Sequence, residues 1–374
     1  IRTLMLGWEF PPFINGGLGV ACEGLVNALA PRSELSLFLP KFRNSASKTK
    51  IQIIPTHYLT HPADFDPYLD ANQTEEIYNK DLDERVEMYS DEAIEASKEI
   101  SFDVIHAHDW LTAIAALKIR EKSGKPLIFH VHSLNYDRAG PDEQGQIYNL
   151  EKQVLQKADH VIAVSHYTKK ICIDYYDADP EKISVIHNGI SPIQAYRHPK
   201  PFPDHLVVFL GRMTRQKGPS HFLEIARKVL SQISNVRFVM AGTGDQLKTL
   251  MTKSIRLGIA NRCHFTGFLG REKIRDLLSM ADVYCMPSIS EPFGLSALEA
   301  AQFGVPVVIS KQSGAAEILT EAKTVDAFDT EQMASGILKQ LDAGITIEPL
   351  PIRDWEDDAS DVVTLYESLL NRAT

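Results

Sequence analysis

Short apolar runs rich in β-branched and aromatic residues alternate with amphipathic stretches along most of the chain. The runs cover residues 2–7, 34–40, 102–108, 126–132, 160–165, 182–189, 206–212, 236–242, 263–267, 282–287 and 305–310. Apolar strands separated by amphipathic helices are typical of parallel sheets that helices cover on both faces. The pattern therefore predicts an α/β fold with doubly wound parallel sheets.

Two expected helices show a stripe of apolar positions three or four residues apart. In residues 218–233 the stripe consists of Phe222, Ile225, Ala226, Val229, Leu230 and Ile233. The last helix is predicted over residues 354–373, with Val362, Leu365, Tyr366 and Leu369 on one side. The acidic run from Glu75 to Glu99 indicates a solvated helical face, and residues 45–80 are predicted to be irregular.

The best boundary between domains is the segment 191–205, which carries four prolines and no helical pattern. We therefore expect an N-terminal domain over residues 1–197 and a C-terminal domain over residues 198–350. Residues 351–374 would form a terminal helix outside the second domain. A chain of 374 residues is long enough for two buried cores.

Composition and charge narrow the range of functions. The net charge of −10 with no basic run argues against a nucleic-acid-binding protein. The four cysteines are far apart among apolar neighbours, which is typical of reduced, buried thiols. No apolar run approaches the roughly 18 residues that a membrane-spanning helix needs, so we expect a cytoplasmic protein, with peripheral membrane contact left open.

A glycine-rich turn between the first strand and the next helix includes Gly16 and Gly17. Such a turn can bring backbone N–H groups close to a phosphate at a helix N-terminus. As a dinucleotide fingerprint it is weak, because Cys22 stands where a third glycine is expected and the next strand ends without an acidic residue. This argues against an NAD-dependent oxidoreductase, and a purely structural tight turn is the alternative.

Histidines gather at the ends of two successive strands. The stretch "HAHDW" places His108, Asp109 and Trp110 at a strand end, where they are predicted to line a cleft and Trp110 to offer a flat face to a sugar. No further carboxylate or cysteine stands at ligand spacing, so no metal site is predicted. His130 and His132 end the next strand, and a structural role is favoured for either histidine taken alone.

Two cations frame a strand–loop–helix unit in the second half of the chain. Arg212 ends a strand and Lys217 precedes the next helix, an arrangement suited to a diphosphate, with solvated loop charges as the alternative. Gly242 opens a second glycine turn, "GTGDQ". Farther along, "SEPFGLSALEAA" carries Glu291 in a turn and Glu299 in the helix that follows, where a simple capping role is the alternative for Glu291.

Together these motifs resemble the retaining glycosyltransferases of GT-B fold, in the large family that includes bacterial glycogen and starch synthases (family 4-like, group 1). The resemblance covers nearly the whole chain and is most specific over residues 206–310, where "GRMTRQKG", "VMAGTGD", "FTGFLG" and "SEPFGLSALEAA" occur in the family's order. It implies two Rossmann-like domains facing across a cleft and a last helix that crosses back onto the N-terminal domain.

The resemblance also implies roles for individual residues. Arg212 and Lys217 match the pair that holds the donor diphosphate, and Glu291 and Glu299 match the two ends of the E-x7-E motif. His132 matches the histidine near the donor sugar. The remaining donor-side residues implied are Gly16, Gly17, Gly242, Phe268, Phe293, Gly294 and Leu295. "HDW" at 108–110 resembles the acceptor-side motif of glycogen synthases.

The expected activity is transfer of a hexose from a nucleotide-diphosphate sugar (UDP-, ADP- or GDP-linked) to a hydroxyl of a saccharide or other acceptor. Retention of anomeric configuration is expected, with no metal and no cofactor. Ile14 stands where bacterial glycogen synthases carry a lysine, which puts glycogen or starch as the product in doubt. The alternatives are a GT-B-fold sugar-nucleotide epimerase or hydrolase and a non-catalytic sugar-nucleotide-binding subunit. The oligomeric state is not readable from the sequence.

Overall fold

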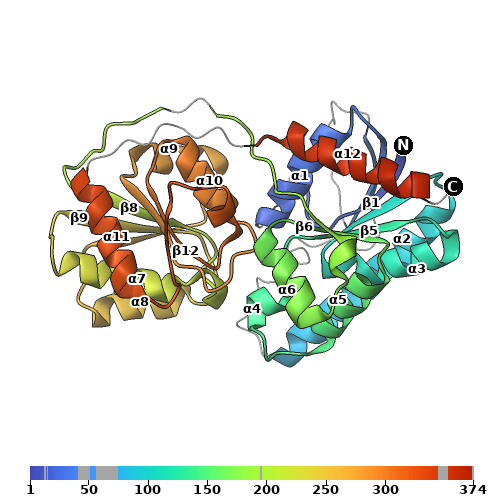
Figure 1. Ribbon diagram of the computed structural model, residues 1–374. Coiled ribbons are helices and arrows are strands. Elements are labelled where there is room, and N and C mark those ends of the chain that lie inside the picture. Colours follow the sequence, from blue (N-terminus) through green and yellow to red (C-terminus); the bar gives the residue numbers. More distant parts are fainter. Residues whose placement is uncertain are drawn as a thin grey trace. The chain divides into compact units, whose positions relative to one another are not determined.

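The computed structural model describes residues 1–11, 14, 16–40, 51–55, 75–193, 196–343 and 353–372. The chain divides into two compact units (Figure 1). Unit 1 comprises Ile1–Ser191 together with Arg353–Thr374, and unit 2 comprises Pro192–Ile352. The division after Ser191 lies in the proline-rich segment, slightly earlier than the boundary at residue 197 expected from the sequence.

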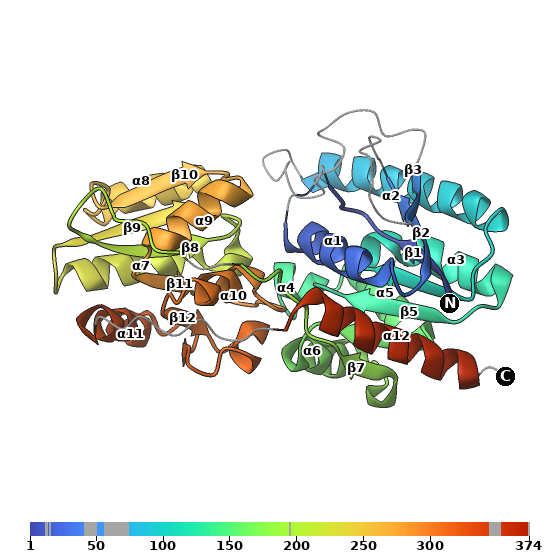
Figure 2. The same ribbon diagram turned by 90° about the horizontal axis from the view of Figure 1, so that it is seen from above.

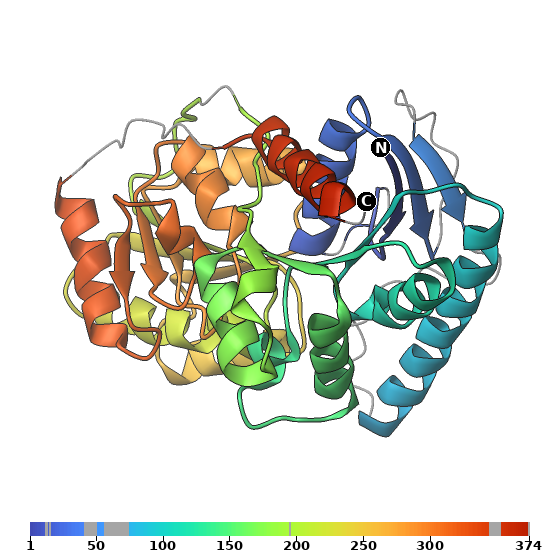
Figure 3. The same cartoon turned by 45° about the vertical axis from the view of Figure 1, so that its right-hand side comes forward.

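Unit 1 is built on a seven-stranded parallel sheet with the strand order β3-β2-β1-β4-β5-β6-β7. The first strands of the chain, in blue, are seen near the N-terminus in Figure 3. Its strands are β1 (Arg2–Leu6), β2 (Glu34–Leu39), β3 (Ile51–Pro55), β4 (Val104–His108), β5 (Leu127–Val131), β6 (His160–Ala163) and β7 (Ile183–Val185). The longer helices are α1 (Gly17–Leu29), α2 (Glu75–Lys98), α3 (Ala113–Ser123), α5 (Gln146–Lys157), α6 (His166–Tyr176) and α12 (Trp355–Arg372), and α4 (Asn135–Ala139) is a single short turn.

Each face of this sheet has its own apolar core, because the strands are buried on both sides. Residues of α2, α3, α5 and α6 pack on one face with the strand residues Leu4, Leu6, Ile105 and Phe129. Residues of α1 and α12 pack on the other face, with Met5, Leu37, Val104 and Ile128 among the strand residues. Alternate residues of β1 thus enter opposite cores, as strand geometry requires.

Unit 2 has a six-stranded parallel sheet with the order β10-β9-β8-β11-β12-β13. Its elements are β8 (His205–Leu210), β9 (Val236–Ala241), β10 (Cys263–Gly267), β11 (Val283–Met286), β12 (Val307–Ser310) and β13 (Lys323–Val325), with helices α7 (Pro219–Leu230), α8 (Leu247–Arg256), α9 (Arg271–Met280), α10 (Leu295–Gln302) and α11 (Thr330–Ala343). The helices α7, α8 and α11 contribute to one apolar core with the strands.

The expected fold class is confirmed: both units are doubly wound parallel sheets, and the last helix belongs to unit 1. Three details differ from expectation. Residues 51–55 form an edge strand beside β2, and residues 323–325 form an edge strand beside β12. The helix that begins at Glu75 is more than a solvated face, because it buries Leu82, Val86, Tyr89, Ala93 and Ile94. The rest of the predicted irregular segment, 45–50 and 56–74, lies outside the described residues.

Helix α12 returns to unit 1 and lies beside α1 (Figures 1 and 2). The contact needs a glycine in α1: a Cβ atom on Gly24 would come within 2.1 Å of the Trp355 ring. Gly189, near the end of the first segment of unit 1, meets the backbone of Asp354 in the same way, and a Cβ atom there would lie 2.4 Å from it. Along α12, the buried residues Val362, Tyr366 and Leu369 confirm the predicted stripe, with Leu365 partly buried.

No helix within the described ranges is both long enough and apolar enough to cross a membrane. All four cysteines, Cys22, Cys172, Cys263 and Cys285, are free and buried, as their apolar neighbours predict.

We expect Trp355→Ala to lower the free energy of unfolding of unit 1 by about 3–5 kcal/mol, because it leaves a cavity over Gly24 at the α1–α12 contact. Urea unfolding followed by far-UV circular dichroism measures the change. The neighbouring Glu356→Ala removes only a surface ion pair with Arg32 and should cost about 1 kcal/mol or less. Equal effects of the two substitutions would contradict the packing role of Trp355.

Candidate active site

The strand order of unit 2 creates a topological switch point between β8 and β11. From β8 the chain winds outward through β9 and β10, and from β11 it winds the other way through β12 and β13. Loops at the carboxyl ends of these two neighbouring strands diverge, and open α/β sheets bind their ligands at such a point. Arg212 lies two residues after the end of β8, and Glu291 lies in the loop after β11, so both belong to the switch-point edge.

Lys217 and Glu291 meet at this edge. The Nζ atom of Lys217 lies 2.5 Å from Oε2 of Glu291, although the two residues are 74 positions apart. The carboxylate is nearly inaccessible, with 6% of the side chain exposed, and the lysine side chain is 18% exposed. The Ser288 hydroxyl donates a second hydrogen bond to the same oxygen, at 3.3 Å. A cation and an anion are therefore paired and largely shielded from water. Arg212, which belongs to the same loop as Lys217, is half-buried.

Glycines with positive φ bring these loops together. Gly218 has a φ of +68°, and a Cβ at this position would lie 1.9 Å from the carbonyl oxygen of Pro287. Gly242, with a φ of +138°, would place a Cβ 2.0 Å from the carbonyl oxygen of Gly211. Any side chain at either position would separate the loop after β8 from its neighbours. The close approach of Lys217 to Glu291 thus depends on the absence of a side chain next to it.

The turn after Glu291 ends at α10. Gly294, with a φ of +103°, caps the helix, and Leu295 begins it, as predicted. Phe293 is buried, whereas Phe268, after β10, is 70% exposed. Glu299 lies on the second turn of α10, where burial raises the pKa of its carboxyl to about 7 against the lowering effect of the Arg271 and Arg275 charges.

The equivalent switch point of unit 1 lies between β1 and β4. Gly16 is the N-cap residue of α1 and Gly17 its first residue, so the glycine turn lies beyond the end of β1. His108 ends β4, and Asp109 and Trp110 follow it. All three are buried, and Trp110 packs into the apolar core of unit 1. In this structure the Trp110 ring therefore offers no open face to a sugar, and the acceptor-side role of 108–110 stays a prediction.

Four histidines form a stacked cluster at the β4–β5 strand ends. His106 Nδ1 is 2.6 Å from the Tyr366 hydroxyl of α12, and His106 Nε2 is 3.1 Å from His130 Nδ1. His108 Nδ1 lies 2.9 Å from His132 Nε2. Burial lowers the pKa of His108 to about 3 and holds those of His106 and His130 well below the usual value. The histidines are therefore neutral near pH 7.

Proximity alone would make this cluster a metal-site candidate, since one nitrogen from each of His106, His108 and His130 lies within 4.8 Å of the others. However, the rings stack with interplanar angles of 12°, 24° and 29°. Ring-nitrogen lone pairs lie in the ring plane, so stacked rings direct them along nearly parallel planes instead of toward one ion. The arrangement suits hydrogen bonding between histidines better than metal ligation. In the sequence, the signal for this histidine cluster was the presence of histidines at alternate positions of two neighbouring strands.

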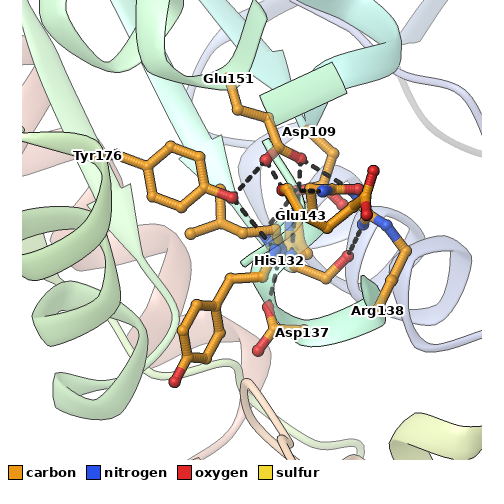
Figure 4. Close-up of polar contacts among 11 residues, drawn as sticks. Asp109, His132, Asp137, Arg138, Glu143, Glu151 and Tyr176 are labelled. Carbon is orange, nitrogen blue, oxygen red and sulfur yellow. Dashed lines mark hydrogen bonds and ion pairs between the residues drawn. The ribbon is translucent and has the colours of Figure 1, made fainter. Parts of the chain in front are cut away.

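Asp109 holds the backbone that carries His132. Its Oδ1 atom accepts hydrogen bonds from the N–H groups of His132, at 2.7 Å, and Ser133, at 3.2 Å (Figure 4). Asp109 has a positive φ of 56°, which is uncommon for a non-glycine residue and tolerated best by Asp and Asn. Burial raises the pKa of the Asp109 carboxyl to about 7, and the two N–H groups act in the opposite direction.

The comparisons with known proteins agree with this architecture. A family profile described as "Glycosyl transferases group 1" matches residues 193–348, and one described as "Glycosyltransferase Family 4" matches residues 15–193. A sucrose-phosphate synthase of Thermosynechococcus elongatus superposes with a TM-score of 0.80 at 20% identity, covering 100% of both chains. The HepE protein of Anabaena, in complex with UDP-glucose, gives a TM-score of 0.70 at 18% identity, covering 100% of this chain and 99% of that one.

Relatives by sequence extend over most of the chain. A glycogen synthase of Mycobacterium tuberculosis is 26% identical over 343 residues, 87% of this chain and 81% of that protein. An alpha-maltose-1-phosphate synthase of Mycolicibacterium smegmatis is 28% identical over 383 residues, 95% of this chain and 92% of that protein. The solved structures show the GT-B fold, and the two family profiles, which together span residues 15–348, show a glycosyltransferase. Within that class, the chain belongs to the group 1, family 4-type glycosyltransferases.

The buried neutral histidines predict acid sensitivity of unit 1. Below about pH 6.5 they accept protons in the unfolded chain but not in the folded one, so the free energy of unfolding falls as the pH falls. His130→Phe removes one such group and should reduce this pH dependence by up to about 1.4 kcal/mol per pH unit. Urea unfolding at pH 7, 6 and 5 compares the slopes. Buried carboxyls with raised pKa change the pH slope of the free energy of unfolding in the opposite direction. They are present in both the wild type and His130→Phe, so their contribution cancels when the two slopes are subtracted. An unchanged slope would contradict the neutral-histidine assignment.

Proposed function

We propose that this glycosyltransferase moves a hexose from a nucleoside-diphosphate sugar to a hydroxyl acceptor, with retention at the anomeric carbon. The observation that carries the proposal is the shielded Lys217–Glu291 pair at the switch point of unit 2, in the loops that follow β8 and β11. The complexes of HepE with UDP and with UDP-glucose support a donor of this class, since that protein shares the fold.

In this proposal the cations neutralise the leaving diphosphate. Departure of the diphosphate leaves an oxocarbenium-like centre and concentrates negative charge on the phosphates. Preorganised positive charge in a site that excludes water is often the largest single contribution to catalysis. Arg212 supplies a planar fork that can hold two phosphate oxygens, and Lys217 supplies a point charge. The glycine-turn amides at Gly16 and Gly17 are proposed to add N–H donors. The Gly242 N–H already donates to the Gly267 carbonyl oxygen at 2.9 Å, so Gly242 is proposed to let the backbone come close to the donor instead.

The pairing of Lys217 with Glu291 suggests how donor binding reorganises the site. A diphosphate competes with Glu291 for the Lys217 ammonium, so its arrival releases one carboxylate oxygen. That oxygen can then accept a hydrogen bond from a hydroxyl of the donor sugar, while Ser288 holds the carboxylate in place. Glu291 is thus an orienting group in our proposal, and trapping of a glycosyl–Glu291 intermediate would contradict it.

The remaining donor contacts follow the family assignment. Glu299 is proposed to contact the ribose from the second turn of α10, and the backbone near Phe268 to meet the base. Phe293, Gly294 and Leu295 would present the start of α10 to the phosphates. His132 would contact the donor sugar. No cofactor is proposed, because the nucleotide sugar is itself the substrate.

The acceptor hydroxyl is proposed to attack from the face that the diphosphate leaves, with a phosphate oxygen taking its proton. We assign no glycogen or starch product, since Ile14 departs from the lysine of glycogen synthases. Analysis of the products with and without a saccharide acceptor separates transfer from the epimerase or hydrolase alternatives. Binding without turnover on any acceptor would instead indicate a non-catalytic subunit. A cytoplasmic location stays a prediction.

We expect Lys217→Ala to lower turnover about a hundredfold or more, because it removes a cation from the diphosphate site. The same change should abolish the rise in melting temperature that UDP, ADP or GDP gives the wild-type protein in a thermal-shift panel. The double variant Lys217→Ala, Glu291→Gln serves as the folding control, since it leaves no buried carboxylate without its partner. Unchanged turnover of Lys217→Ala would contradict the diphosphate role.

Activity is expected to survive EDTA, because Arg212 and Lys217 supply the positive charge that a divalent ion would otherwise provide at the phosphates. Initial rates before and after dialysis against EDTA test this, and the anomeric proton signals of donor and product test retention in the same samples. Strict dependence on added Mg²⁺ or Mn²⁺, or an inverted product, would refute the respective part of the proposal.

A further inference from the structure

The segment after β5 has an unusual set of hydrogen-bond partners. Five successive backbone N–H groups, from His132 to Tyr136, each donate to a side-chain oxygen (Figure 4). The acceptors are Asp109 for the first two, then Asp137 at 2.8 Å, Glu151 at 2.8 and 3.0 Å, and the Tyr176 hydroxyl at 3.2 Å. Consecutive amides of this kind attract anions, and here the protein's own groups satisfy them.

Glu151 occupies the centre of this set. It comes from α5, is fully buried, and forms an ion pair of 2.8 Å with Arg138. The Tyr176 hydroxyl of α6 donates to its Oε2 atom at 2.8 Å. Burial raises the pKa of Glu151, whereas Arg138, the Asn135 N–H and the Tyr176 hydroxyl all favour the ionised form. One buried carboxylate thus connects α5, α6 and the segment that carries His132.

Arg138 extends the connection to Ser133. One guanidinium nitrogen donates to Glu151 and the other donates to the Ser133 hydroxyl oxygen at 2.9 Å. The Ser133 oxygen is therefore used as an acceptor, so its own hydrogen is directed elsewhere. Asp109 accepts a hydrogen bond from the backbone N–H of Ser133, so both the backbone and the side chain of Ser133 are held in place.

We propose that Glu151 and Arg138 are positioning residues, which hold His132 and Ser133 in the geometry needed for sugar transfer without touching either substrate. The kinetic part of this inference rests on the proposed function. A group fixed by backbone and side-chain contacts is preorganised, and a displacement of about 1 Å at a reacting site can cost about a hundredfold in rate.

The test compares Glu151→Gln, Arg138→Lys and Tyr176→Phe with Lys152→Met. Lys152 is the next residue of α5 and forms an exposed ion pair of 2.5 Å with Asp177, so it controls for changes to the same helix outside the set. Hydrogen–deuterium exchange of the peptide covering 132–139 is measured together with kcat and the donor KM.

We expect exchange of this peptide to accelerate about tenfold to a hundredfold in Glu151→Gln and Arg138→Lys, because each loses a charge-assisted hydrogen bond. We expect kcat to fall at least about tenfold while the donor KM changes less than about threefold. Tyr176→Phe should give a smaller change of the same kind, and Lys152→Met none. If Glu151→Gln fails to fold, the exchange and the kcat of Arg138→Lys and Tyr176→Phe decide whether the proposal holds.

Two results would overturn the proposal: unaltered exchange in these variants, or faster exchange with unchanged kcat. A wild-type protein that transfers no sugar from any donor would refute the proposed function, while the exchange measurement would still test the hydrogen-bond set.

Discussion

The reversal of winding direction at the middle of each sheet is the constraint on which the rest of the structure depends. In unit 2 the chain leaves β8 toward β9 and leaves β11 toward β12, so the loops after two adjacent strands part from each other. At that edge Lys217 and Glu291, which are 74 positions apart, approach within hydrogen-bond distance. Gly218 and Gly242 allow the approach, because a side chain at either position would clash with a neighbouring loop. The packed apolar strands hold the strand ends that carry these loops in place.

The two units use this edge in different ways. In unit 2 a cation and a carboxylate hold each other, and a ligand of either charge must displace one partner. In unit 1 the amides after β5 are saturated by carboxylates and a tyrosine hydroxyl of the chain itself. The first arrangement is suited to exchange with an anionic ligand, because one contact can replace another. The second is suited to rigidity, because the backbone donors of the segment are already in use.

The sequence predicted the sheets well because a buried parallel strand must be apolar throughout, and that pattern is readable without knowing its neighbours. The edge strands β3 and β13 were not predicted, because they are short and partly polar. The donor-side residues were found because they lie in recognisable motifs of the segments that follow apolar strands. Glu151 was not found from the sequence, because an acidic residue on an amphipathic helix is normally expected at the surface. Its burial depends on Arg138 and Tyr176, which other elements supply. Trp110 shows the opposite case, because it follows a strand end, as a site residue would, but packs into the apolar core.

The packing of Trp355 over Gly24 has a consequence for biosynthesis. One face of the unit 1 sheet is covered by α1 and α12, which are separated in the sequence by the whole of unit 2. During synthesis the whole of unit 2 emerges before α12 does, so unit 2 can fold while this core of unit 1 still lacks Trp355, Val362 and Tyr366. The domain that is made first thus completes its core last. Until α12 has emerged and packed, that apolar face needs protection from aggregation.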